Sequence, residues 1–325
     1  MKLLILGGTA QLGRAVASAA VRAGHDVTCL ARGESGEAPE GARHVVGDRE
    51  TADGLAPVRG VSWDAVVDVT RHPGQVRRAV AELEAQHWVY VSTVSVYVDE
   101  GGVPDESGEV VEPLVAQRME RPEDYPAAKV ACERAVLEGA GADRVLVVRP
   151  GLIGGPEDDT DRSGYWPYRM SHPVERRVLV PDAVTQPVQL VDVRDLAAWL
   201  VRCLDDRVVG VVDAVGEQTT LGEVLAESAA LAHEVPEPVV VSGDWLLEHG
   251  VDPWMGPESL PLWLPEPTAS MRRSGQAARD LGLRHRPLRE TLRAALADAE
   301  GRGARPWRAG LSYPRERELI REARG

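Results

Sequence analysis

The sequence of 325 residues contains no phenylalanine, three cysteines and only two lysines, Lys2 and Lys129. Cys29, Cys132 and Cys203 are isolated and odd in number, which favours reduced thiols over disulfides or a metal site. No apolar run reaches the roughly 18 residues that a membrane span needs. The short apolar run at the N-terminus ends in glycines, unlike the core of a signal peptide. We therefore expect a cytoplasmic protein without a membrane contact.

The charge balance excludes further classes of partner. The net charge of −14 argues against a surface for nucleic acid or anionic membranes. The eight His residues show no ligand spacing such as His-Glu-x-x-His, so we expect no metal. We interpret the acidic run at residues 157–161 as a solvated loop.

Short apolar runs alternate with helical patterns over the first 150 residues. We expect strands at residues 3–6, 27–30, 45–46, 65–69, 88–93 and 145–148, and helices at 14–23, 75–84 and 125–139. This alternation predicts an α/β fold, a doubly wound parallel sheet with helices on both faces. Residues 151–185 are rich in Gly, Pro, Asp and aromatics, whereas 188–214 return to the earlier pattern, with strands at 188–191 and 208–212 and a helix at 195–204. We predict a nucleotide-binding domain of the Rossmann type from residues 1–150 plus about 186–216. A smaller C-terminal substrate domain would comprise about 151–185 plus 217–325.

A glycine-rich turn, Gly7-Gly8-Thr9-Ala10-Gln11-Leu12-Gly13, follows the first expected strand and opens the first expected helix. This placement is that of a dinucleotide fingerprint, with Ala10 at the position where the backbone approaches pyrophosphate. The helix N-terminus offers N–H groups and a positive dipole end to phosphates. The predicted cofactor contacts here are Gly7, Thr9, Ala10, Gln11, Leu12 and Gly13.

The residues after the second expected strand bear on the choice of cofactor. An acidic residue there would hold the ribose 2′-hydroxyl of NAD, and none is present. Arg32 stands there instead and is able to pair with a 2′-phosphate. This favours NADP(H) over NAD(H), with a solvated loop cation as the alternative for Arg32.

Tyr125 and Lys129 lie four residues apart and share one face of an expected helix. A phenol has a pKa of about 10, and a nearby ammonium lowers it by stabilising the phenolate. Tyr125 is thus a candidate for proton exchange with a carbonyl or alcohol oxygen. Nearly every other cation is Arg. The presence of Lys at position 129 therefore indicates a role for a compact ammonium, a point donor, rather than for the planar, forked guanidinium of Arg.

Hydroxyl side chains close the fifth expected strand, in Ser92-Thr93-Val94-Ser95-Val96-Tyr97. The carboxyl end of a strand in an open α/β sheet lies beside the ligand crevice, where a hydroxyl can bind a substrate oxygen. Together with the glycine turn and the Tyr-Lys pair, this segment resembles the extended short-chain dehydrogenases/reductases, or NAD-dependent epimerase/dehydratase family. The resemblance is clear over residues 1–215.

The resemblance implies a role for several further residues. The catalytic trio would be Thr93, Tyr125 and Lys129, with Ser92 and Ser95 as substitutes for Thr93, and Lys129 would also hold the nicotinamide ribose. The additional cofactor contacts implied are Asp48, Arg49, Val69, Thr70 and Pro150, although Val69-Thr70 departs from the family's small-residue motif.

Three functions stay open at this point. We expect an NADP-dependent oxidoreductase that acts on the carbonyl or alcohol of a small, cyclic or apolar metabolite, because aromatics gather at Tyr165, Trp166, Tyr168, Trp254 and Trp263. Those aromatics equally suit the core of the smaller domain. A sugar-nucleotide epimerase or dehydratase is the first alternative, disfavoured because Leu152 and Gly154 stand where such relatives often carry Asn and Tyr. A non-catalytic NADP- or RNA-binding protein is the second. A homodimer through the helices near 75–85 and 125–138 is also open.

Overall fold

The computed structural model describes residues 1–98, 105–266, 268–303 and 306–324. The chain folds into two compact units, each built from three separate segments. Unit 1 consists of Met1–Gly151, Val193–Val215 and Arg273–Arg284. Unit 2 consists of Leu152–Asp192, Gly216–Arg272 and His285–Gly325.

Unit 1 is a parallel sheet of seven strands in the order β10-β6-β5-β4-β1-β2-β3. Its inner strands are largely apolar because both faces of the sheet are covered: the four residues from Leu3 to Leu6 are fully buried, whereas the edge strand β3 is partly exposed. The strands are β1 (Lys2–Leu6), β2 (Asp26–Ala31), β3 (Arg43–Val46), β4 (Ser62–Asp68), β5 (Glu84–Val91), β6 (Val145–Pro150) and β10 (Gly210–Ala214).

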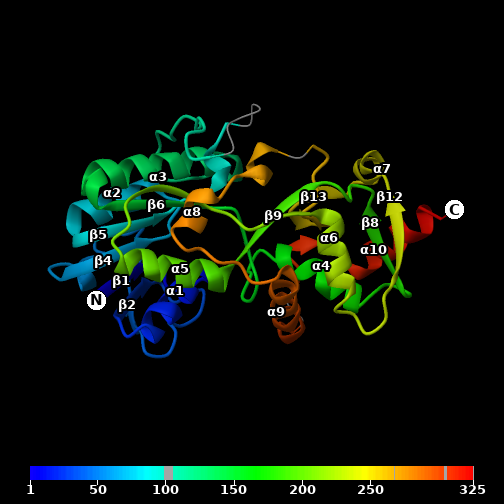
Figure 1. Ribbon diagram of the computed structural model, residues 1–325, viewed down its shortest axis with the longest axis horizontal. Helices are drawn as coiled ribbons and strands as arrows, with labels where there is room; N and C mark the ends of the chain where they lie inside the picture. The colour runs from blue at the N-terminus through cyan, green and yellow to red at the C-terminus, as the bar shows by residue number, and fades with distance from the viewer. Residues whose placement is uncertain (99–104, 267, 304–305, 325) are drawn as a thin grey trace. The chain divides into compact units, whose positions relative to one another are not determined.

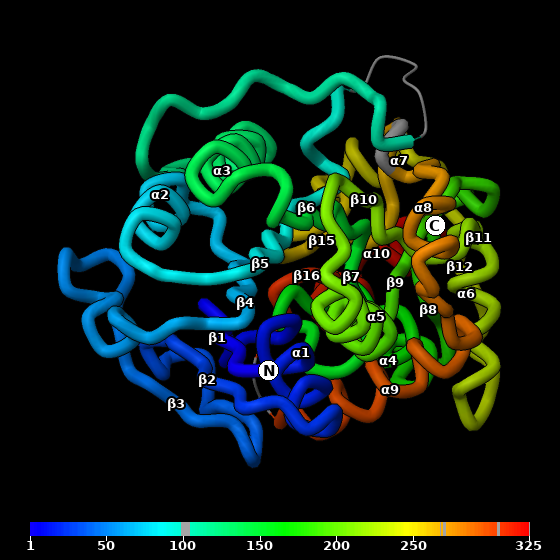
Figure 2. Tube along the Cα trace, turned by 60° about the vertical axis from the view of Figure 1, so that its left-hand side comes forward, coloured from blue at the N-terminus to red at the C-terminus, as the bar shows by residue number. Residues whose placement is uncertain are grey.

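Helices cover both faces of this sheet. Figures 1 and 2 show α2 (Pro73–Glu82) and α3 (Tyr125–Ala140) over one face and α1 (Gln11–Arg22) and α5 (Val193–Asp205) over the other. Val76 of α2 and Val136 of α3 pack in one core with strand residues such as Val66. This arrangement confirms the predicted doubly wound α/β fold.

The strand order reverses beside β1, because β2 and β3 follow on one side and β4, β5 and β6 on the other. In such sheets ligands bind outside the carboxyl ends of the strands at this switch point. The glycine turn after β1 and residues Val69 and Thr70 after β4 stand at this place.

Unit 2 has its own core and several small sheets. Three strands pair in the order β11-β9-β7, and β12-β8, β13-β15 and β14-β16 form pairs. Its core includes Tyr165, Trp166 and Trp263. The strands are β7 (Leu152–Gly154), β8 (Arg177–Pro181), β9 (Pro187–Asp192), β11 (Gln218–Thr220), β12 (Glu237–Val241), β13 (Asp252–Trp254), β14 (Gly256–Pro257), β15 (Ser259–Pro261) and β16 (Ala309–Gly310), and the helices are α4 (Arg162–Ser171), α6 (Leu221–Ala229), α7 (Gly243–Glu248), α9 (Leu288–Gly301) and α10 (Tyr313–Glu322).

Several expected boundaries differ from those observed. The strand expected at residues 188–191 pairs with β7 and β11, so residues 186–192 lie in unit 2. Residues 273–284, with α8 (Gln276–Asp280), lie in unit 1, where α8 packs against β10. The fifth strand ends at Val91 rather than residue 93, because Thr93 caps a 3₁₀ turn, η2 (Val94–Val96).

Two searches of the described residues concern membranes and metals. Within the described ranges, no helix combines the length and apolar character that crossing a bilayer requires. The same residues include no group of three or more His, Cys, Asp or Glu side chains placed to hold a metal ion.

Candidate functional site

The glycine turn is fixed by close backbone approaches. Gly7 has a φ of +98° and its N–H donates to the Leu30 carbonyl at 2.9 Å. A Cβ on Gly13 would lie 2.1 Å from the Gly7 carbonyl oxygen, so only glycine fits there. Ala10 at the N-cap of α1 gives no side-chain cap, which suits a turn that presents a helix N-terminus to phosphate.

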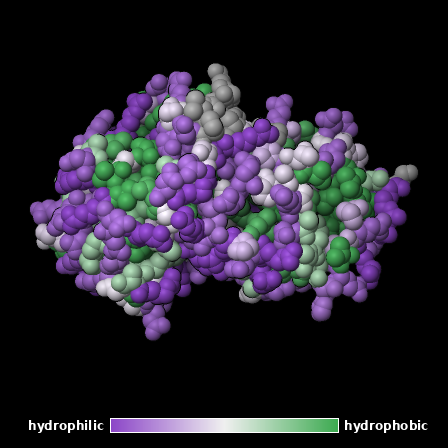
Figure 3. Space-filling view, viewed as in Figure 1, coloured by the Kyte–Doolittle hydropathy of each residue, from purple (hydrophilic) through white to green (hydrophobic). Residues whose placement is uncertain are grey.

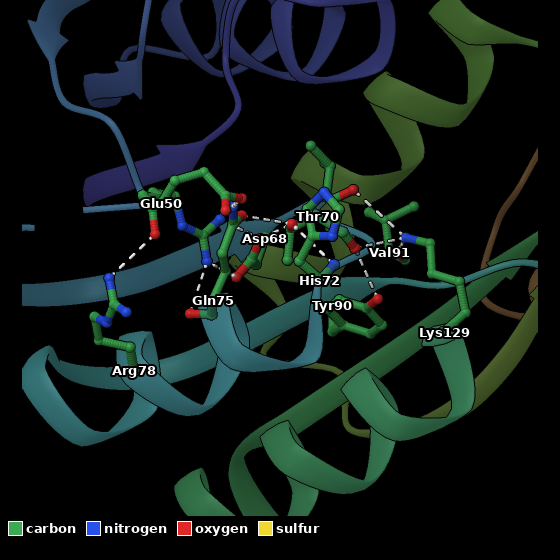
Figure 4. Close-up of polar contacts among 11 residues, drawn as sticks. Glu50, Asp68, Thr70, His72, Gln75, Arg78, Tyr90, Val91 and Lys129 are labelled. Carbon is green, nitrogen blue, oxygen red and sulfur yellow. Dashed lines mark hydrogen bonds and ion pairs between the residues drawn. The ribbon is translucent and has the colours of Figure 1, made fainter. Parts of the chain in front are cut away.

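Lys129 is the best-defined polar group of the site. Its Nζ donates to the main-chain carbonyls of Val91 at 2.6 Å, Thr70 at 2.9 Å and Val69 at 3.4 Å (Figure 4). The side chain is 3% exposed, and burial lowers its pKa to about 8. Lys129 therefore joins α3 to the ends of β4 and β5, and the predicted ribose contact requires it to exchange one of these carbonyls.

Tyr125 precedes this lysine in α3, and Thr93 lies close in sequence to Val91, one of its partners. Tyr125 is the first residue of α3, one turn before Lys129, and is partly exposed. Thr93 follows the Val91 carbonyl that Lys129 contacts by two residues. Its Oγ1 accepts from the Ser95 N–H and donates to the Ser95 hydroxyl, both at 3.2 Å.

The two substitutes for Thr93 differ in exposure. Ser95 is exposed, whereas the Ser92 hydroxyl is buried and has no hydrogen-bond partner among the described residues.

A polar network links the ends of β3 and β4. Arg49 donates to both carboxylate oxygens of Asp68, at 2.8 and 2.7 Å, and to the Gln75 carbonyl at 3.0 Å. Glu50 accepts from the Gln75 amide at 2.6 Å (Figure 4). The guanidinium of Arg49, a predicted cofactor contact, is therefore engaged within the fold. Sequence reasoning missed Asp68, whose only signal was an acidic residue closing an apolar strand.

The other predicted contacts lie around the same edge. Val69 packs on the turn, since a Cβ on Gly7 would lie 2.7 Å from its Cγ2. The carbonyl of Thr70 accepts from Lys129 and from the Tyr90 hydroxyl. Asp48 accepts from the Glu50 N–H at 2.9 Å.

The remaining contacts of this set lie in the turn and at strand ends. Thr9 and Leu12 are buried, Gln11 is partly buried, and Pro150 ends β6. Arg32, just after β2, is more than half exposed and pairs with Glu34 at 2.8 Å.

The structure of unit 2 differs from two expectations, one on the aromatic residues and one on the acidic run at 157–161. Tyr165, Trp166 and Trp263 are fully buried in its core, so these three do not offer rings to a ligand, whereas Tyr168 and Trp254 are partly exposed. The acidic run at 157–161 is not simply solvated. Asp158 is buried and accepts from the N–H and hydroxyl of Ser163, and buried Asp161 accepts from Arg302 and the Arg308 N–H.

Known proteins resemble this chain over most of its length. One relative is the chloroplast stem-loop binding protein of 41 kDa b of Arabidopsis thaliana, 25% identical over 259 residues, which are 74% of this chain and 65% of that protein. The solved UDP-glucuronic acid 4-epimerase of Bacillus cereus, in complex with NAD, has a TM-score of 0.68 at 13% identity, with 93% of this chain and 99% of that chain covered.

A second epimerase structure shares the fold. The UDP-N-acetylglucosamine 4-epimerase of Bacillus cereus has a TM-score of 0.66 at 17% identity, covering 94% of this chain and 99% of that chain. Residues 64–214, which carry Asp68, Thr93, Tyr125 and Lys129, match the model of the NAD dependent epimerase/dehydratase family. Over this segment the chain is similar to that family, and it shares the fold of the two epimerases.

Proposed function

We propose that the protein is an NADP-dependent oxidoreductase that interconverts a carbonyl and an alcohol on a small metabolite. The observation that carries the proposal is the placement of Lys129, which holds the helix face of Tyr125 against the carboxyl ends of β4 and β5. The cradle at Gly7 and Gly13, which a Cβ would fill, supports a bound dinucleotide.

Each residue of the trio has a distinct task in this proposal. A bound NADP(H) supplies or accepts the hydride. Tyr125 gives its phenolic proton to the substrate oxygen in reduction and removes it in oxidation. The Lys129 ammonium stabilises the phenolate and holds the tyrosine helix in place. Thr93 turns its hydroxyl from Ser95 to the same substrate oxygen, where negative charge develops.

The cofactor preference is tested by fluorescence titration with NADPH and NADH. We expect Arg32→Ala to weaken NADPH binding about tenfold or more, because a 2′-phosphate loses a charged partner, and to leave NADH binding nearly unchanged. Arg22→Ala removes an exposed cation from the other end of α1 and serves as the control. Equal affinity of the wild type for both cofactors would remove the NADP assignment.

The proton-transfer role is tested with Tyr125→Phe. On a panel of small cyclic and apolar ketones and aldehydes, NADPH oxidation by this variant should fall at least about 100-fold, the typical contribution of a general acid. Cofactor affinity should stay within about twofold, since the ring is retained. Undiminished turnover would take Tyr125 out of the mechanism.

A sugar-nucleotide epimerase or dehydratase is the second candidate, supported by the fold shared with the two UDP-sugar epimerases. A Cβ on Gly154 would lie 2.6 Å from Leu190 Cδ1, so a tyrosine does not fit there without rearrangement. This weighs against the candidate. Cofactor that survives purification, together with conversion of a UDP-sugar without net NADPH consumption, would establish it instead.

Nucleic-acid binding is a third candidate because of the name of the Arabidopsis relative. The net charge of −14 weighs against it, since phosphate contacts dominate such binding. We expect no salt-sensitive retention of a stem-loop RNA at physiological ionic strength, and nanomolar binding would overturn this expectation.

We also infer a homodimer through α2 and α3. Figure 3 shows hydrophobic residues gathered over these helices, and the family resemblance implies pairing there. Ala81→Arg places a charge at an exposed position of α2 and should shift the mass in light scattering toward the monomer. Ala52→Arg, exposed in a turn of the same unit, is the control. A wild type that is already monomeric at micromolar concentration would contradict the dimer.

A further inference from the structure

Five side chains form a buried polar network in unit 1 that the proposed mechanism does not use. They are Tyr97, Glu133, Arg149, Asp213 and Arg273. Two arginines balance two carboxylates, and the tyrosine lies between them in the network. Burying so many charges is costly unless each is paired. Removing one member therefore leaves its partners with an uncompensated buried charge.

Tyr97 is the centre of this network. Its hydroxyl donates to Asp213 Oδ1 at 2.8 Å and accepts from Arg149 at 2.8 Å. The Cζ of Arg273 lies 3.4 Å from the centroid of its ring. Because Tyr97 directly follows the turn η2 that Thr93 caps, fixing its ring fixes the end of that turn.

The network also reaches the helix of the predicted proton donor. Arg149 donates to both oxygens of Glu133, at 2.9 and 2.6 Å. Glu133 follows Lys129 by four residues and Tyr125 by eight, so the three share one face of α3. The same ionic chain thus joins the helix of Tyr125 to the turn of Thr93.

Arg273 closes the network from a distant part of the sequence. It is 4% exposed, donates to Asp213 Oδ2 at 2.9 Å and to the Asp105 carbonyl, and stacks on Tyr97. The planar guanidinium donates hydrogen bonds and stacks on an aromatic ring at the same time, which a lysine ammonium does not do. Resting on the proposed function, we propose that Arg273 is a positioning residue that sets the Thr93 turn against α3 and so shapes the nicotinamide end of the cofactor site.

The test separates the two ends of the cofactor. We compare affinities for NADPH and for 2′,5′-ADP, which is its adenosine half, by calorimetry. In the wild type the nicotinamide half should strengthen binding. Arg273→Gln should reduce the ratio of the two affinities about tenfold while the affinity for 2′,5′-ADP stays within about twofold. Arg272→Gln, which removes the exposed neighbouring cation, should leave the ratio unchanged.

Two further variants keep the test decisive should Arg273→Gln not fold. Arg273→Lys retains the charge without the stacking fork and should lower the ratio to an intermediate value. Tyr97→Phe retains the ring without the hydroxyl and should lower it as well. An unchanged ratio in the folded variants would overturn the inference, as would an equal loss of both ligands, which indicates a structural role only.

Failure of the proposed function gives a different result from failure of the role of Arg273. A wild type that binds NADPH no better than 2′,5′-ADP would have no nicotinamide subsite. That result would refute the oxidoreductase itself, whereas a normal wild-type ratio that survives Arg273→Gln refutes only the role of Arg273.

Discussion

At the scale of single residues, Lys129 is held by a geometry that suits a point charge. Three carbonyl oxygens converge on one nitrogen, and the Tyr90 ring centroid lies 4.9 Å from it. A guanidinium directs its donors outward in a plane and is larger. The same contacts explain why a chain with 37 Lys and Arg residues keeps one of its two lysines here.

We predict that Lys129→Arg damages the protein despite conserving charge. Forcing the larger group into a packed site should cost about 1–3 kcal/mol of unfolding free energy, and turnover should drop at least about 100-fold. Lys2→Arg changes the other lysine, whose ammonium lies over Trp63, and is the matched control. Urea denaturation and NADPH oxidation measure both effects, and normal turnover of Lys129→Arg would contradict the point-donor role.

The pKa of Lys129 gives a second prediction, on pH. Its pKa falls from 10.5 to about 8 on burial, so between these values the unfolded chain binds more protons than the folded one. Stability then rises with pH across this window, by up to about 3 kcal/mol from this group. The unfolding free energy of the wild type relative to Lys129→Met should therefore increase between pH 8 and 10.5, and a flat difference would refute the lowered pKa.

At the scale of elements, the β1–α1 turn depends on one glycine. We predict that Gly13→Ala abolishes NADPH binding and lowers the unfolding free energy by about 3 kcal/mol, because its Cβ would meet backbone that has no room to shift. Gly301→Ala is the control: it lies in α9 with open space around it and should be neutral or stabilise by up to about 1 kcal/mol. Binding by Gly13→Ala comparable to the wild type would contradict the assigned turn.

The inner strands of the large sheet were predictable because burial on both faces requires a nearly continuous apolar run, as in β1 and β6. β9 has the same kind of run, yet pairs in unit 2, since periodicity does not reveal which sheet a strand joins. The candidate site likewise has a part that the sequence predicts and a part that it does not. Tyr125 and Lys129 follow from helical spacing, whereas the bonds of Arg49 to Asp68 and of Arg273 to Asp213 join residues 19 and 60 positions apart, which no local pattern encodes.

At the scale of the whole molecule, a buried ion pair links separate segments of unit 2. Arg169 of α4 and Glu316 of α10 lie 3.0 Å apart, and Glu316 also accepts from the Leu179 N–H of β8 at 2.9 Å. Both side chains are almost completely buried. The pair therefore connects α10, near the end of the chain, to α4 and β8, which lie more than 130 residues earlier.

We predict that Glu316→Ala lowers the unfolding free energy by about 3–5 kcal/mol, because it leaves a buried guanidinium without its carboxylate. Glu318→Ala, which removes an exposed partner of Arg315, should cost at most about 0.5 kcal/mol. Thermal unfolding of both variants, followed by tryptophan fluorescence, makes the comparison. Equal stabilities would show that the pair contributes nothing.

The return of residues 273–284 to unit 1 has a consequence for synthesis. A ribosome delivers the sheet, Tyr97 and Asp213 first, and Arg273 only after the 57 residues from Gly216 to Arg272 have emerged. Until that moment the Asp213 carboxylate lacks its guanidinium partner. Completion of unit 1 therefore requires translation of most of unit 2, and a chain that ends before Arg273 would leave the buried Asp213 carboxylate without its guanidinium partner.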